Sequence, residues 1–218
     1  HIYSNDGYGL RVWSPGPTSD DNVIADNQVY DVAYDGIRVG ENCVSTTVRS
    51  NIVHDTNRQS DPTFHRGGIV LWDSTDNTVE YNHVYNVGSA GGTTTNSAGI
   101  CTGGPSTSGH IRYNRLLNNT NDGILLLDFN ATVTPTVNCN YIYGNGRYGL
   151  RNGHPTANIH AEGNWWGHNP PLSSGQGVPA DIANLANVFW SPAMTLSVAA
   201  SPSSIPANGV STALVTAP

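Results

Sequence analysis

The feature that most constrains this chain is a repeat of 24 to 32 residues. Each repeat holds an asparagine, with one apolar residue three positions before it and another two positions after it. A glycine then opens a further apolar stretch. A period of this length is typical of solenoids, in which each repeat packs only on its neighbours. The repeat asparagines are Asn27, Asn51, Asn82, Asn114, Asn140 and Asn164, and the repeat glycines are Gly9, Gly36, Gly68, Gly99, Gly123 and Gly149.

The residues around these markers predict three short strands in each coil. Helix formers are scarce, whereas Val, Ile, Thr and Tyr recur at regular spacing. Side chains alternate along a strand, so one apolar column before the asparagine, one after it and two after the glycine should point inward. These columns begin at Ile24, Val29, Leu10 and Val12. Stacked coils place like residues over like, and the asparagine amides should form an internal ladder at a corner.

Six repeats in phase resemble the superfamily of right-handed parallel β-helix proteins, which includes secreted pectate-lyase-like and surface proteins. The resemblance covers residues 1–168, and it implies the right-handed sense together with the general rule for parallel crossovers. We therefore expect an all-β, single-stranded solenoid of six to seven coils. The β-helix with its capping segment should span residues 1–193. The first coil begins in mid-turn, which would expose an unpaired parallel edge, so we expect a fragment truncated at both ends.

The stretch GNWWGHNPP and the later NVFWSP resemble the terminal signature of many secreted β-helix proteins. This resemblance implies that Trp165, Trp166 and Trp190 cover the open end of the core. A short helical turn is expected within residues 179–187. Residues 194–218 resemble the first strands of a bacterial immunoglobulin-like domain of the invasin and intimin type, and they are too few to form a sandwich.

Composition excludes several classes of function. The net charge is −7 and the chain has no lysine, which argues against nucleic acid and anionic membrane surfaces as partners. No run of 18 apolar residues exists, so no membrane insertion is expected. The three cysteines lack paired or metal-ligand spacing, and isolated buried thiols are the simplest interpretation.

Two adjacent coils carry long corners. The step from asparagine to glycine is 17 residues from Asn51 and from Asn82, against 9 in three other coils. The first long corner carries Arg58, His65 and Arg66. Loops that leave a rigid scaffold at one place often carry function, although solenoid corners also tolerate insertions without one.

Outward positions of the strand after the glycine include Trp13, Arg38 and Trp72. An exposed Trp suits the face of a sugar ring, and a neighbouring Arg suits a uronate carboxylate. Val70 and Leu125 lie in the same outward column, and exposed apolar patches mark an interface. We therefore favour the interpretation that a loop or another domain covers the outward face of these strands. A shallow sugar groove along the same face is the alternative.

These patterns predict a secreted or cell-surface protein with an adhesive or structural role and possible carbohydrate contact. The expected partner is an extracellular polysaccharide or another surface protein. The alternative is a polysaccharide lyase, hydrolase or epimerase, which needs clustered carboxylates and often Ca²⁺. A calcium ion is possible near Asp73 and Asp76, and catalytic residues remain unknown. The candidate carbohydrate-binding residues are Arg58, His65, Arg66, Trp72, Asp73, Trp13 and Arg38.

Overall fold

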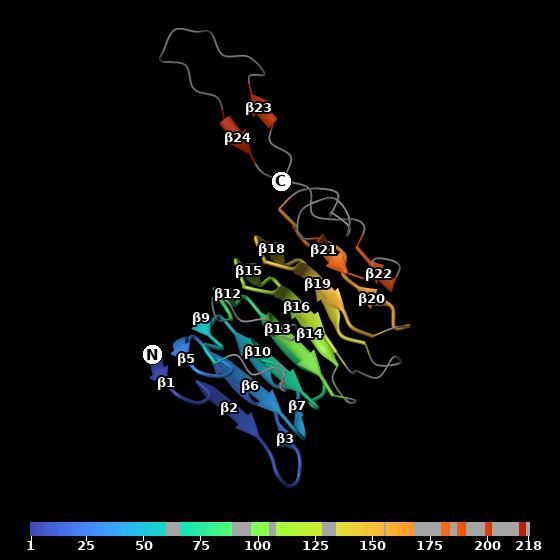
Figure 1. The fold of residues 1–218 in the computed structure, drawn as a ribbon. Coiled ribbons are helices and arrows are strands. Elements are labelled where there is room, and N and C mark those ends of the chain that lie inside the picture. The colour runs from blue at the N-terminus through green and yellow to red at the C-terminus, as the bar shows by residue number, and fades with distance from the viewer. Residues whose placement is uncertain are drawn as a thin grey trace.

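Three parallel sheets wind around one apolar core in the computed structural model of the chain (Figure 1). The structure describes residues 1–59, 66–88, 97–104, 108–127, 134–154, 156–167, 180–183, 187–190, 199–201 and 214–216. We name the three sheets after their place in the repeat: pre-asparagine, post-asparagine and post-glycine. They hold five, six and seven strands, respectively, which corresponds to about five turns against the six to seven predicted.

Each sheet takes one strand from each coil, in sequence order. The pre-asparagine sheet consists of β4 (Val23–Ala25), β8 (Thr47–Arg49), β11 (Asn77–Glu80), β14 (Gly109–Arg112) and β17 (Thr136–Asn138). The post-asparagine sheet consists of β1 (Ile2–Asn5), β5 (Gln28–Val32), β9 (Ile52–Thr56), β12 (His83–Tyr85), β15 (Arg115–Leu117) and β18 (Tyr141–Tyr143). The post-glycine sheet consists of β2 (Leu10–Trp13), β6 (Ile37–Gly40), β10 (Arg66–Trp72), β13 (Ser97–Gly103), β16 (Asp122–Leu126), β19 (Tyr148–Asn152) and β21 (Ala180–Ala183).

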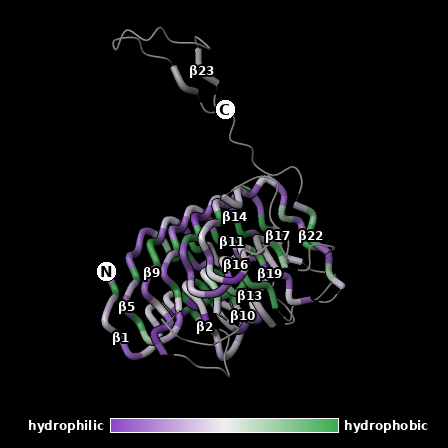
Figure 2. Tube along the Cα trace, turned by 45° about the horizontal axis from the view of Figure 1, so that its top comes forward, coloured by the Kyte–Doolittle hydropathy of each residue, from purple (hydrophilic) through white to green (hydrophobic). Residues whose placement is uncertain are grey.

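The predicted inward columns form the core. Ile24, Val29 and Ile37 are buried, as are their counterparts in the following coils, while Leu10 and Val12 of the first coil are partly buried against them. Figure 2 shows the resulting pattern, with hydrophobic stretches along the stacked strands and hydrophilic stretches at the corners. The register pairs equivalent residues, such as Ile37 with Ile69. The apolar ladders therefore follow directly from the repeat.

The asparagine ladder is confirmed. From Asn27 to Asn164, each side-chain amide Nδ2 donates to Oδ1 of the asparagine in the next coil, at 3.0 to 3.1 Å. The residue before each of these asparagines has a φ between 55 and 70°, in the left-handed region. This conformation is costly for residues other than glycine, and the ladder fixes it at the same corner of every coil.

Two shorter parallel pairs of strands form separate sheets beside the three long ones. β3 (Ser19–Asp20) pairs with β7 (Cys43–Val44), and β20 (Ile159–His160) pairs with β22 (Val188–Phe189). β23 (Ala199–Ser201) and β24 (Leu214–Thr216) form an antiparallel pair within the segment that resembles an immunoglobulin-like start. The immunoglobulin-like assignment stays a prediction, because most of that segment lies outside the described residues.

The helical turn predicted for residues 179–187 is wrong for residues 180–183, whereas Asn187 lies in a 3-10 turn. Ala180–Ala183 form strand β21, which pairs in parallel with β19. The backbone groups at the edge of β19 would otherwise lack strand partners, and a parallel strand satisfies them better than a helical turn does. Of the three tryptophans predicted to cover the end of the core, Trp166 is fully buried, Trp165 is partly buried and Trp190 packs on the core.

Two other expectations concern membranes and cysteines. No helix among the described residues is long and apolar enough to cross a membrane. Cys43 and Cys101 are buried free thiols, and Cys139 is a free thiol that is partly buried. The interpretation of isolated thiols is therefore confirmed.

Candidate functional site

The outer face of the post-glycine sheet carries a cluster of arginines around one tyrosine in its first three coils. Tyr8 lies just before the first repeat glycine, and three guanidinium carbons face its ring. The Cζ atoms of Arg11, Arg66 and Arg38 lie 5.2, 5.5 and 6.0 Å from the ring centroid. These distances are within the range of cation–π attraction. We call Tyr8, Arg11, Arg38 and Arg66 the Tyr8 cluster.

Asp35 neutralises part of this positive charge. Its side chain is fully buried, its Oδ2 lies 2.9 Å from Nη1 of Arg38 and 3.8 Å from Nη1 of Arg66, and its Oδ1 accepts the Gly67 N–H at 3.0 Å. Burial raises the pKa of the Asp35 carboxyl, while both arginines and the Gly67 N–H oppose that rise. Because a buried carboxylate needs such partners, Asp35 fixes both arginines in place.

Arg66 connects three coils. It begins strand β10 in the third coil, and its Nη1 donates to the Tyr8 hydroxyl in the first coil at 3.0 Å. On the way its guanidinium lies 4.3 Å from the centroid of the Tyr34 ring, in the second coil. The side chain is almost completely buried. Arg66 therefore belongs to the framework of the cluster and is not open to solvent.

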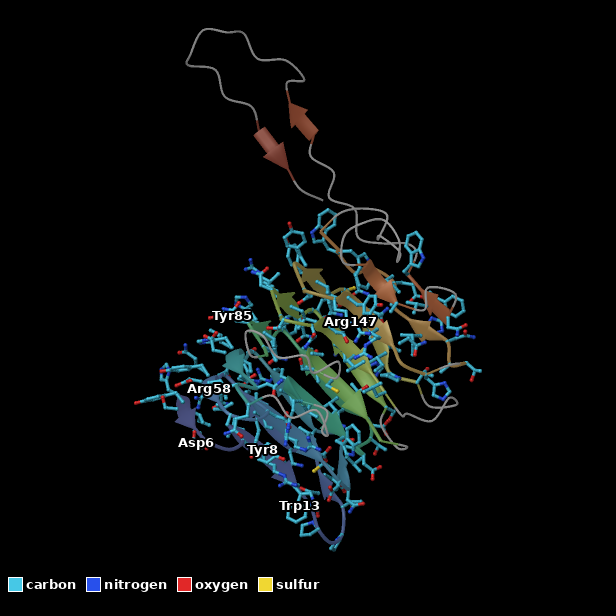
Figure 3. The ribbon with its side chains drawn as sticks, in the orientation of Figure 1. Asp6, Tyr8, Trp13, Arg58, Tyr85 and Arg147 are labelled. Atoms are coloured by element: carbon cyan, nitrogen blue, oxygen red, sulfur yellow. The ribbon has the colours of Figure 1, made fainter. Side chains whose placement is uncertain are left out.

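Trp13 provides the exposed aromatic surface beside the cluster. It ends strand β2, and 45% of its surface is exposed. Arg11 lies 4.8 Å from its ring centroid, and its indole N–H donates to the Glu41 carboxylate. Figure 3 shows Trp13 and Tyr8 on the same side of the stack, at the first coils. A tryptophan held at its edge in this way presents a ring that can contact a sugar.

Trp72 lies two coils further, in register with Trp13 and Gly40. A β-carbon at Gly103 of the next coil would collide with the Trp72 ring, which shows that the ring lies directly over this glycine. Arg38 lies 5.9 Å from its centroid. The Trp72 ring therefore fills the space over Gly103, so no shallow groove is left at that position. Gly40, between the two tryptophans, is itself buried.

The centre of this face is covered. The outward residues Val70, Ala98, Cys101 and Leu125 are buried and form a second apolar cluster, with Trp72 packed against it. The interpretation that the face is covered is thus confirmed for these coils. Among the described residues this apolar cluster interrupts any groove along the sheet, and Trp13 is the large apolar side chain of this face that is exposed.

A second Asp–Arg pair lies beyond the covered patch. Asp122 is fully buried, and its Oδ2 lies 2.7 Å from Nε of Arg151 in the next coil. Burial raises the pKa of the Asp122 carboxyl to about 6, although Arg151 and Arg147 oppose the rise. This carboxyl can therefore hold a proton at mildly acidic pH.

The predicted site residues do not form one group. Arg66 and Trp72 begin and end the same seven-residue strand, which places their backbones ~20 Å apart. Arg58 lies at another corner, where its guanidinium pairs with Asp31 at 2.9 Å and Asp6 at 3.6 Å (Figure 3). His65 lies outside the described residues. Trp13 and Arg38 do lie together with Arg66, as parts of the Tyr8 cluster and its surroundings.

The calcium prediction gains no support from the described residues. Asp73 follows β10, and Oδ1 of Asp76 accepts a hydrogen bond from the Ser108 hydroxyl at 3.1 Å. In the part of the chain that the structure describes, no three His, Cys, Asp or Glu side chains are placed to hold one metal ion. Residues Asp73 and Asp76 alone provide too few ligands for Ca²⁺, which takes six or more oxygens.

Sequence reasoning missed Tyr8, Arg11 and Asp35 as site residues. A signal for two of them exists, because Tyr8 and Asp35 each precede a repeat glycine and Asp122 has the same place in a later coil. Arg11 stands one coil before Arg38 in the outward column. These positions show which side chains share a face. They do not show that Arg66 reaches back over two coils.

The match to known families agrees with this architecture. Residues 1–165 match the model of the family described as the right-handed β-helix region, and the chain belongs to this family. No curated protein and no solved structure matches the chain. The family establishes the fold and its handedness, and it assigns no ligand.

Proposed function

We propose that this β-helix is an adhesive or structural module of a secreted or cell-surface protein, and that it contacts carbohydrate next to Trp13. The observation that carries the proposal is the exposed Trp13 ring, which is fixed at its edge by Glu41 and has the Arg11 guanidinium over one face. An exposed aromatic ring with polar groups on both sides is suited to a sugar, whose apolar face stacks while its hydroxyls bond. The partner would be an extracellular polysaccharide or a glycan on another surface protein.

A rigid solenoid favours a binding role at this place. The Tyr8 cluster rests on parallel strands, and the buried Asp35 links it to the backbone of the third coil through Gly67. Such a surface loses little conformational freedom when it binds a ligand, which improves affinity. One exposed aromatic ring offers few contacts, so we expect weak binding at each site that strengthens when many copies of the module are displayed on one surface.

The second candidate is an enzyme that modifies polysaccharides, and the Asp122 carboxyl is the observation that favours it. A carboxyl with a pKa of about 6 can serve as a general acid or base. Asp122 is fully buried, however, and lies four strands from Trp13 in the post-glycine sheet. A binding role fits the accessible residues better than catalysis does.

Glycan-array screening followed by calorimetric titration tests the binding proposal. We expect wild-type protein to bind at least one extracellular glycan at micromolar to millimolar concentration, and Trp13→Ala to abolish that binding. Tyr81→Ala is the matched control, since Tyr81 is 59% exposed and lies on a different corner of the solenoid. Equal loss in both variants, or undiminished binding by Trp13→Ala, would rule out this site.

The enzyme candidate has its own assay. Wild-type protein and Asp122→Asn are incubated with the glycans that bind, and the release of reducing ends or unsaturated sugars is measured. Turnover by wild type that Asp122→Asn loses would establish catalysis. Binding without any product would leave the adhesive role as the function.

A further inference from the structure

We propose that the outer face of the post-asparagine sheet is the interface of a symmetric dimer with a second copy of this chain. The proposal goes beyond the carbohydrate contact and does not depend on it, because Trp13 lies on another sheet. We call the outward side chains of β1, β5, β9, β12, β15 and β18 the tyrosine face. Two observations support the proposal: the aromatic character of this face, and the way its charge changes along the stack.

The tyrosine face holds a large share of the apolar side chains that solvent reaches. Among the described residues nine large hydrophobic side chains are exposed, and four of them project from this sheet: Tyr3, Ile52, Tyr141 and Tyr143. Their exposed fractions lie between 40 and 58%. Exposed apolar side chains that gather on one face mark an interaction surface, and tyrosine is enriched in such surfaces.

Stacking orders the aromatic rings of this face. Tyr3, Tyr30, His54 and Tyr85 take equivalent positions in four successive coils, and neighbouring ring centroids lie 5.2, 5.0 and 4.7 Å apart. Neighbouring ring planes differ by 9° or less. The rings therefore present a row of edges whose positions are fixed before any contact forms. Such a surface loses little side-chain freedom when it enters an interface.

The first three coils of the tyrosine face are acidic. Asp31 and Asp55 belong to β5 and β9, and Asp6 follows β1. Arg58 compensates part of this charge, because its guanidinium lies 2.9 Å from Asp31 and 3.6 Å from Asp6. Figure 3 shows Asp6 and Arg58 on the same side of the stack as Tyr85. Three carboxylates and one guanidinium leave these coils with a negative charge.

The last three coils of the face carry the opposite charge. None of the residues of β12, β15 and β18 is acidic, and Arg115 in β15 is exposed. Within the described residues the Arg115 side chain makes neither a hydrogen bond nor an ion pair, and its guanidinium carbon lies 5.8 Å from the ring centroid of Tyr141. A ring contact of this kind holds a guanidinium in place and leaves its N–H donors available for a carboxylate.

A two-fold axis that runs along the strands matches these charges. It reverses the order of the coils, so β5 of one copy lies opposite β15 of the other, and β1 lies opposite β18. Asp31 of each copy then faces Arg115 of the other copy, and this contact occurs twice in the dimer. If the coils ran in the same order, Asp31 would face Asp31. Charge complementarity therefore selects the reversed order.

The size of the face predicts a weak dimer. Six strands spaced about 4.8 Å apart, each with about four residues of about 3.3 Å, give a flat area of roughly 300 Å². A standard stable interface buries about 800 Å² on each partner. We therefore expect a dissociation constant of about 100 µM.

Sedimentation velocity from about 1 µM to about 1 mM protein measures this association. We expect the wild type to pass from monomer to dimer in this range, and salt at about 0.5 M to weaken the dimer. Arg115→Glu should raise the dissociation constant about tenfold or more, because both copies of the contact become repulsive. Arg49→Glu is the matched control, since Arg49 is exposed and belongs to the pre-asparagine sheet. It should dimerise as the wild type does.

A mixture of two variants tests the pairing itself. Asp31→Arg alone should also weaken the dimer, because an arginine then faces Arg115. Mixed in equal amounts, Asp31→Arg and Arg115→Glu should form a heterodimer with close to the wild-type dissociation constant, because both contacts again join opposite charges. If Asp31→Arg loses the wild-type circular dichroism spectrum, Asp6→Arg takes its place, since Asp6 is 95% exposed and faces the same guanidinium as Asp31.

The outcomes decide the proposal. A wild type that stays monomeric up to about 1 mM overturns it. A dimer that Arg115→Glu leaves unchanged, or that Arg49→Glu weakens equally, shows that the interface is elsewhere and also overturns it. A mixture without heterodimer overturns the reversed order of the coils. Loss of glycan binding in Trp13→Ala is measured separately, so the dimer and the carbohydrate contact can fail independently.

Discussion

Replacement of Asn114 by alanine should remove about 4 kcal/mol of stability, because this side chain lies in the middle of the buried ladder. Its Oδ1 accepts from N and Nδ2 of Asn82, both at 3.0 Å. Its Nδ2 lies 2.8 Å from the Val79 carbonyl, 3.0 Å from the Arg112 carbonyl and 3.0 Å from Oδ1 of Asn140. Asn114 is 1% exposed, so water does not replace these partners without local opening.

The magnitude follows from the number of bonds. Five hydrogen bonds are lost, and each contributes about 1 kcal/mol net, with a larger cost where a buried donor or acceptor stays unsatisfied. One amide proton shared between two acceptors lowers the sum somewhat, which gives the value of about 4 kcal/mol. Domains of this size have a free energy of unfolding of about 5 to 15 kcal/mol, so the loss is a large fraction of the total.

Urea unfolding followed by circular dichroism measures this loss, with Asn138→Ala as the control. Asn138 is partly buried, and its amide makes only two hydrogen bonds, both at 3.2 Å and both to Glu162. That control should cost less than about 1 kcal/mol. A loss in Asn114→Ala below about 1 kcal/mol, or one equal to that of the control, would show that the ladder does not hold the coils together.

A double-mutant cycle tests whether the ladder acts as a connected unit. Asn82→Ala and Asn114→Ala both remove the bond from Nδ2 of Asn82 to Oδ1 of Asn114, whereas the bond from the Asn82 backbone N–H is lost only in Asn114→Ala. The double variant should therefore be more stable than the sum of the single effects predicts, by about 1 kcal/mol or more. Simple additivity would mean that the two side chains contribute independently.

Three further predictions concern the core, a buried carboxyl and a corner. Leu126→Asp should abolish folding, seen as loss of the strand signal in circular dichroism, because an unpaired charge in the apolar stack costs several kcal/mol; Asn138→Ala should stay folded, and equal melting temperatures would contradict the strand phase. The folded-state pKa of Asp122 is about 6, above the reference value of 3.8, so stability should fall by up to roughly 3 kcal/mol as pH rises from about 4 to about 7; urea titrations should show that Asp122→Asn removes this slope. Gly109 has a φ of 132° and no room for a β-carbon, so Gly109→Ala should lower the melting temperature by several degrees, whereas Gly16→Ala, with no neighbour within 4 Å, should leave it unchanged.

Part of the candidate site could be predicted from the sequence. The period of two along a strand places Trp13, Arg38 and Trp72 on the outward side of one sheet, and the structure confirms this placement. Closeness in sequence was misleading for Arg66 and Trp72, because an extended strand separates residues by about 3.3 Å each. Arg66 and Trp72, which are close in sequence, therefore lie at opposite ends of strand β10.

The repeat by itself determined the fold, because in a solenoid every coil makes the same contacts with the next one. Once Asn51 and Asn82 are recognised as equivalent, their stacking and the columns around them follow, since local spacing decides which side chains point inward. The tertiary structure alone decided where charge is compensated. Arg66 reaches Tyr8 across 58 positions of sequence, and Asp35 pairs with Arg38 while Arg11 keeps no ionic partner within the described residues. Such choices depend on side-chain rotamers and on the space between coils, which no repeat period encodes.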